Sequence, residues 1–252
     1  MKVFRISAFI GLAFAAALTS VLLFWPGLAA AQGLSLDFGD GPSATGRMFQ
    51  IIILLTVLSL APSILIMTTS FIRIVIVLSF LRSALGLQQT PPNTVLVGLS
   101  IFLTFFIMST TFEAAYKNGL APLIADQITE TEALERGAAP FHEFMIKQVR
   151  EKDLALFMGI AKIDNVETPE DVPYRVLVPS FIISELRRAF EIGFLLFVPF
   201  LVIDMVVASI LMSMGMMMLP PIIISLPFKL IFFVLVDGWY LIVGSLTESF
   251  RI

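Results

Sequence analysis

SFIISELRRAFEIGFLLFVPFLVIDMVVASILMSMG, residues 180–215, changes in character along its length. Its first half mixes charged with apolar residues, and its second half is apolar except for Asp204. An apolar segment of about 20 residues is long enough to cross a bilayer as a helix. We therefore predict one long helix that starts near Pro179, is amphipathic at first and then becomes membrane-associated.

The composition of the whole chain is that of a membrane protein. Its 252 residues are 58% hydrophobic and 14% charged, with a mean hydropathy of +0.97, whereas soluble domains have roughly 45–50% apolar and 25% charged residues. The net charge of −3 and the absence of a basic block argue against a nucleic-acid partner. The chain has no cysteine, and His142 is its single histidine. We therefore expect no disulfide, no metal site and no cofactor.

Residues 1–31 read as a cleavable signal peptide. Lys2 and Arg5 precede an apolar run from Ile6 to Trp25, and Ala29-Ala30-Ala31 forms a small-residue cleavage site. The run is somewhat long for a signal, so an uncleaved first membrane helix is the alternative. Cleavage would leave the mature N-terminus outside the cytoplasm.

The rest of the chain divides by composition into four segments. Residues 32–47 are rich in Gly, Asp and Ser and read as a flexible leader. Residues 48–112 and 179–252 are expected to form two hydrophobic helical hairpins, and residues 113–178 a small extramembrane helical domain on the periplasmic side. The fold class expected is all-α.

The extramembrane segment carries a predicted helix with paired charges. In HEFMIKQVREKD, residues 142–153, Glu143 and Lys147 are spaced to pair on a helix, and so are Lys147 and Glu151. An apolar stripe recurs at four-residue steps at Phe141, Met145 and Val149. This pattern is typical of a solvated helix with a modest core.

Charged side chains also lie within or beside the apolar segments: Arg73, Asp204, Lys229 and Asp237. A charge at the bilayer centre costs roughly 2.5–3.5 kcal/mol on insertion scales. These side chains must therefore face protein, one another or water. Structural ion pairs, such as Arg73 or Lys229 with Asp204, are one interpretation. A proton- or solute-coupled transporter that uses the same residues is the other, although the sequence lacks the internal symmetry of many transporters.

The start of the long helix is suited to packing between copies of the chain. Glu185, Arg188 and Glu191 follow one another at three-residue steps and fall on roughly one face. The other face carries Phe190, Phe194 and Phe197.

Five methionines crowd the end of the long helix: Met212, Met214, Met216, Met217 and Met218. They lie beside Gly215 and before Pro220-Pro221, which indicates an irregular loop at a bend between helices. Methionine is flexible and adapts to changing surfaces. If several copies surround an axis, such loops would form an apolar ring, and apolar constrictions can close a pore without a charged gate. Plain packing is the alternative interpretation.

Two long blocks carry a family resemblance. They are PSILIMTTSFIRIVIVLSFLRSALGLQQTPPNTVLVGLSIFLTFFIM, residues 62–108, and SELRRAFEIGFLLFVPFLVIDMVVASILMSMGMMMLPPIIISLPFKLIFFVLVDGWYLIVGSL, residues 184–246. Both closely resemble the FliP family of flagellar biosynthesis proteins, which is related to the SctR family of injectisomes. The signal peptide and the middle domain fit the flagellar branch.

The resemblance implies a core subunit of the flagellar type III protein export gate. In that family, generally five copies build a helical cone with FliQ and FliR, beside other export gate proteins, and unfolded flagellar subunits pass along its axis. It implies a multi-pass protein of the inner membrane at the flagellar basal body, largely facing the periplasm. The family's methionine-rich loop matches Met216, Met217 and Met218, as the gasket of the closed pore. The resemblance makes Asp204 and Lys229 structural or assembly residues.

An enzyme is the third function class. Acid–base chemistry needs positioned titratable groups, but His142 lies in the charged extramembrane segment, away from the apolar blocks. Only Asp204 and Asp237 could pair as carboxylates, and neither has a recognisable motif. We therefore expect no enzymatic activity.

Overall fold

A computed structural model describes residues 44–163, 166, 168–216 and 219–250. The expected signal peptide, most of the expected leader, and Met217 and Met218 lie outside the described residues. The chain divides into two units, residues 1–56 and 57–252. Among the described residues every regular element is a helix, and the chain is all-α as predicted.

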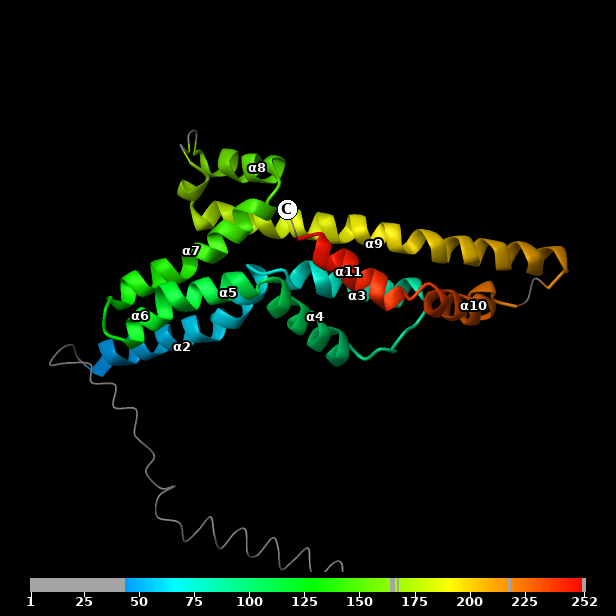
Figure 1. Cartoon of the computed structure of the whole chain (residues 1–252), viewed down its shortest axis with the longest axis horizontal. Helices are drawn as coiled ribbons and strands as arrows, with labels where there is room; N and C mark the ends of the chain where they lie inside the picture. The colour runs from blue at the N-terminus through cyan, green and yellow to red at the C-terminus, as the bar shows by residue number, and fades with distance from the viewer. Residues whose placement is uncertain (1–43, 164–165, 167, 217–218, 251–252) are drawn as a thin grey trace, which may run out of the picture. The chain divides into compact units, whose positions relative to one another are not determined.

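The helices follow one another with short connections (Figure 1). They are α2 (Ala44–Met67), α3 (Phe71–Ala84), α4 (Asn93–Ile107), α5 (Ser109–Ala115), the π-helical turn η1 (Tyr116–Leu120), α6 (Ala121–Ile124), α7 (Glu130–Gln148), α8 (Glu151–Ala161), the 3-10 turn η2 (Pro169–Asp171), α9 (Tyr174–Ser213), α10 (Pro221–Leu235) and α11 (Gly238–Glu248). All of them from α3 onward belong to the unit of residues 57–252.

The long helix predicted from residues 180–215 is α9. It has 40 residues, begins at Tyr174 and runs through Pro179 and Pro199. Among the described residues it is the one helix that is long and apolar enough to cross a membrane by itself. Three further pairs of helices pass the same test together but are bent, among them α4 with α5 and α6, at 68°. Counting each bent pair as one span gives up to four candidate spans.

The last hydrophobic segment forms two helices, α10 and α11, and the chain bends by 64° between them. Asp237 at the junction has a left-handed backbone with a φ of +50°, and Gly238 lies where a Cβ would come within 2.2 Å of the Phe233 ring. Pro221 starts α10 instead of interrupting a helix, because proline suits the first helical turn.

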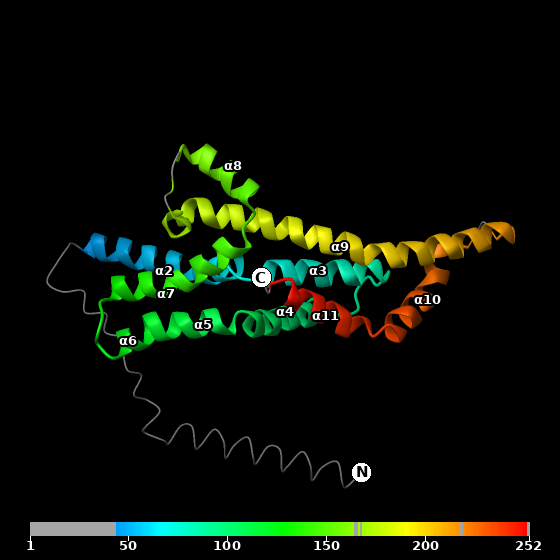
Figure 2. The ribbon, with the colours of Figure 1, turned by 45° about the horizontal axis from the view of Figure 1, so that its top comes forward.

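The main core lies between α3 and α9, with α11 packed against it. Figures 1 and 2 show α3 alongside α9, and α10 and α11 leading back from the far end of α9. The buried residues of this core include Ile74, Val77, Leu78, Leu81, Ala189, Phe200, Phe233, Ile242 and Leu246. Gly193 of α9 permits the close contact with α3, because a Cβ there would lie 2.4 Å from Cδ2 of Phe80.

A second core joins α7 and α8 to the first half of α9. Its buried residues are Met145, Val172, Val176, Leu177 and Phe181. The predicted pair of Glu143 and Lys147 is confirmed, at 2.6 Å. The predicted pair of Lys147 and Glu151 is wrong, because α7 ends at Gln148 and Glu151 begins the next helix.

Candidate functional site

Two charged side chains in the described part of the chain are fully buried, and they face each other. Arg73 of α3 and Glu185 of α9 both have side chains that are 0% exposed. Nε of Arg73 donates to Oε2 of Glu185 at 2.8 Å, and Nη2 donates to the other carboxylate oxygen. This two-point contact between guanidinium and carboxylate is stronger and more directional than a single hydrogen bond.

The remaining donors of Arg73 are also satisfied. Nη1 donates to the main-chain oxygen and to Oγ of Ser249, each at 3.0 Å, and Nη2 also donates to Oε1 of Gln148 at 3.1 Å. The guanidinium carbon lies 3.7 Å from the centre of the Phe250 ring, within the range of a cation–π contact. Arg188 donates to the same Gln148 oxygen at 2.9 Å.

We call these residues the Arg73 cluster: Arg73, Gln148, Glu185, Arg188, Ser249 and Phe250. The cluster ties together α3, α7, α9 and the segment after α11. A buried charge is tolerated when it is paired and hydrogen-bonded, so the cluster explains how an arginine can lie inside an apolar core.

A second buried charge joins α3, α9 and α10. Nζ of Lys229 donates to Oδ2 of Asp204 at 2.7 Å and to the main-chain oxygen of Ala84 at 3.1 Å. Oγ of Ser225 donates to Oδ1 of Asp204 at 2.5 Å. Ala84 ends α3, where helix carbonyls lack partners within the helix and attract cations. We call this arrangement the Lys229 bridge.

The sequence left open which of the deep charges pair. In the structure Arg73 pairs with Glu185, and Lys229 pairs with Asp204. Asp237 is exposed at the bend between α10 and α11, and its carboxylate has no ion pair or hydrogen bond with the described residues. The prediction thus identified both cations, but it did not identify Gln148 and Ser249 as partners of Arg73. Neither residue stands in a periodic pattern that could have indicated this role.

A third polar contact connects α8 to α9. Arg150 donates to both carboxylate oxygens of Asp153, at 3.0 and 3.1 Å, and Oγ of Ser184 donates to Oδ2 at 2.7 Å. Burial by itself would raise the pKa of Asp153. The hydrogen bonds from Ser184 and Arg150 and the charges of Arg150 and Arg187 outweigh burial and lower the pKa below its usual 3.8. This contribution to stability is therefore present at neutral pH and is lost as the pH falls through the lowered pKa.

The described part of the methionine-rich segment, residues 211–216 and 219, lies at the far end of α9, and we call it the methionine turn. The side chains of Met212, Met214 and Met216 are all exposed. Gly215 has a φ of +74° and follows the last residues of the helix. Three of the five predicted gasket methionines are therefore described, and each presents its side chain at the surface.

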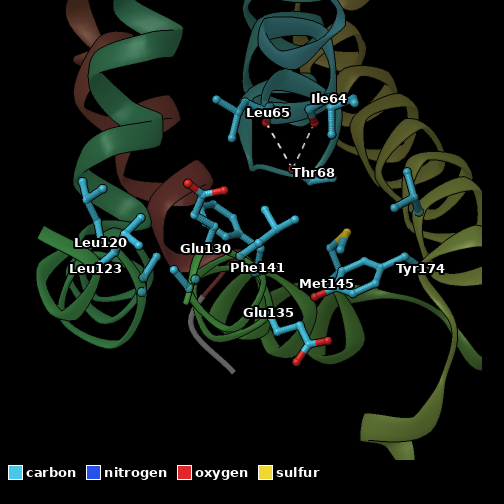
Figure 3. A pocket seen from close by; sticks show the side chains of 17 residues that line it. Ile64, Leu65, Thr68, Leu120, Leu123, Glu130, Glu135, Phe141, Met145 and Tyr174 are labelled. Carbon is cyan, nitrogen blue, oxygen red and sulfur yellow. Dashed lines mark hydrogen bonds between the residues drawn. The ribbon is translucent and has the colours of Figure 1, made fainter. Parts of the chain in front are cut away.

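A cavity of about 810 Å³ lies among the end of α2, the segment from α5 to α6, α7 and the start of α9 (Figure 3). Its wall is mainly apolar and includes Leu120, Phe141 and Met145. The Thr68 hydroxyl at its edge donates to the Ile64 carbonyl of its own helix at 3.0 Å. Such a wall suits a hydrocarbon or an apolar side chain. Within the described residues no group of three His, Cys, Asp or Glu side chains could hold a metal ion.

A sequence profile described as the FliP family matches residues 54–246. This range includes the methionine turn, the Lys229 bridge and all of the Arg73 cluster except Ser249 and Phe250. The protein named flagellar biosynthetic protein FliP from Caulobacter vibrioides is 59% identical over 227 residues, which cover 90% of this chain and 85% of that protein.

Proteins of the same name from two other bacteria are similarly close. The Bacillus subtilis protein is 58% identical over 217 residues, covering 86% of this chain and 98% of that protein. The Pectobacterium carotovorum protein is 57% identical over 201 residues, covering 80% and 78%. Matches of this length and identity show that this chain belongs to the FliP family of flagellar biosynthesis proteins.

Proposed function

We propose that this chain is a core channel subunit of the flagellar type III protein export gate. It works in several copies, generally five in this family, together with FliQ and FliR, and unfolded flagellar subunits pass through the assembled pore. It lies in the inner membrane at the flagellar basal body, with residues 113–178 on the periplasmic side. Membership of the FliP family supports this proposal.

The exposed apolar surface is the observation that carries the proposal beyond the family. Among the most exposed large apolar side chains are Phe102 and Phe106 of α4, Phe194 and Leu195 of α9, and Val234 and Leu235 of α10. Exposed apolar surface of this extent is covered in a working protein by lipid or by other protein. Several copies around an axis, with two small membrane partners, would cover it.

The deep charges support a structural role over a conducting one. Arg73, Lys229 and Asp204 are each held by hydrogen bonds to partners in the same chain. A charge that carries an ion needs freedom to exchange partners, whereas these charges join helices that are distant in the sequence. We propose that Glu185 and Arg188 of the Arg73 cluster share this structural role, and that Asp237 contributes at a contact with another subunit.

The methionine turn is the proposed gasket of the closed pore. Met212, Met214 and Met216 present flexible, polarizable side chains, and Met217 and Met218 extend the same run in the sequence. When several copies surround an axis, these side chains would meet as an apolar ring. Such a ring excludes water and ions until an exported chain pushes the side chains aside.

The assembly itself is testable by native mass spectrometry. We expect the chain, extracted in mild detergent after coexpression with its FliQ and FliR counterparts, to appear as a ring of several copies that retains both partners. The apolar faces on α4, α9 and α10 are the physical reason, because they need a protein or lipid cover. A monomer or dimer that ignores both partners would contradict the channel proposal.

The gasket makes a separate prediction. Replacing Met212, Met214 and Met216 together with Ala shortens three exposed apolar side chains and should raise the leak of small ions several-fold through the assembled complex. Membrane potential in cells, or conductance of the purified complex in a bilayer, measures this leak. The matched control is Met205→Ala, an exposed methionine of α9 two helical turns before the turn. A triple variant that assembles and leaks no more ions than the control would rule out the gasket.

A further inference from the structure

The end of α9 is closed by a specific pair of main-chain hydrogen bonds. The N–H of Gly215 donates to the Met212 carbonyl at 3.1 Å, and the N–H of Met216 donates to the Leu211 carbonyl at 3.0 Å. With the φ of +74° at Gly215, these nested bonds form a Schellman motif, which satisfies carbonyls that the helix leaves without partners. The methionine turn therefore begins with a defined cap.

Both main-chain polar groups of Met216 make hydrogen bonds. Its N–H donates to Leu211, and its carbonyl accepts from the N–H of Leu219 at 3.4 Å. Pro220 then precedes α10. The backbone that carries the Met216 side chain is thus tied to the last turn of α9 on one side and to the approach to α10 on the other.

Glycine is required at position 215 for its backbone and not for space. A positive φ is strained for residues with a Cβ, and glycine adopts it freely. A Cβ added to Gly215 would meet nothing within 4 Å. A substitution there therefore tests the backbone conformation alone, because no neighbouring side chain has to move.

We propose that Gly215 is a positioning residue for the gate. By ending α9 in a Schellman motif, it sets the direction in which Met216 leaves the helix, at the same end of α9 as the exposed Met212 and Met214. This inference rests on the proposed gasket function. It makes the closed seal depend on the helix cap at the end of α9.

The test compares Gly215→Ala with the wild type in the complex with both partners. The left-handed conformation is disfavoured for alanine, so the ratio of capped to uncapped turns should fall about tenfold. Because the uncapped turns are the ones that leak, we expect a closed-state ion leak about tenfold larger. Gly215→Asn should restore most of the seal, since asparagine adopts this conformation more readily. The matched control is Gly244→Ala in α11, where a Cβ also meets nothing and the backbone is helical.

The outcomes separate this inference from the proposed function. If the methionine triple variant raises the ion leak and Gly215→Ala does not, the gasket proposal is supported and the positioning role of Gly215 is wrong. If neither variant raises the ion leak, the gasket proposal itself is wrong. If Gly215→Ala does not assemble, its ion leak cannot be measured. Hydrogen exchange of the main-chain amides in the wild-type complex then tests whether the cap forms. Protected amides at Gly215 and Met216 support the cap, and exchange as fast as in an unstructured segment overturns it.

Discussion

Replacing Glu185 with alanine should destabilise the folded chain by about 3–5 kcal/mol, because removal of one partner leaves the other charge buried and unpaired. Arg73 has no access to solvent, with a side chain that is 0% exposed. It would keep its hydrogen bonds to Gln148 and Ser249, but neither partner carries a negative charge. We expect less assembled complex in the membrane and a lower temperature of thermal unfolding in detergent.

Two further variants show whether the buried pair causes this effect. Arg187 and Glu191 form an exposed pair on the same helix at 2.8 Å, and Glu191→Ala should cost below about 0.5 kcal/mol. The double variant Arg73→Met with Glu185→Leu removes both charges and should recover a large part of the lost stability. The Arg73 cluster would not be a stabilising element if Glu185→Ala unfolded at the wild-type temperature.

In the Lys229 bridge, removal of Asp204 should destabilise the chain more than removal of Lys229. The Lys229 side chain is 4% exposed, whereas that of Asp204 is 34% exposed. Asp204→Ala therefore leaves a buried ammonium group with the Ala84 carbonyl as its remaining partner, at a cost of about 1.5–3 kcal/mol for the lost charged hydrogen bond. Lys229→Met leaves a carboxylate that water can reach and that Ser225 still contacts, so we expect it to cost clearly less. Thermal unfolding of the purified complex measures both.

The same bridge separates the channel from a coupled transporter. If the bridge is structural, Asp204→Asn reduces the amount of assembled complex, and export and motility fall in proportion. A transporter role would show as normal assembly with abolished transport. Glu170→Gln is the matched control, because Glu170 is exposed and has no ion pair with the described residues, and it should leave thermal stability unchanged.

Local patterns predicted the features that depend on neighbouring residues. Apolar length predicted a long helix, and α9 covers nearly all of residues 180–215. The i,i+4 spacing predicted the pair of Glu143 and Lys147. The same reasoning failed at Lys147 and Glu151, because spacing cannot show that a helix ends between them. It also missed the bend at Asp237, where a left-handed residue and the contact of Gly238 with Phe233 divide one apolar run into two helices.

The all-helical class, the membrane character and the membership of the FliP family follow from composition, apolar run length and motifs, which can be read along the chain. Which charges meet depends on how the helices pack. Arg73 and Glu185 lie 112 positions apart, and Arg73 and Ser249 lie 176 apart. No local periodicity reaches across such distances. Their pairing depends on α3, α7, α9 and α11 packing together, and a charge inside that packing is stable only where the fold supplies its partner.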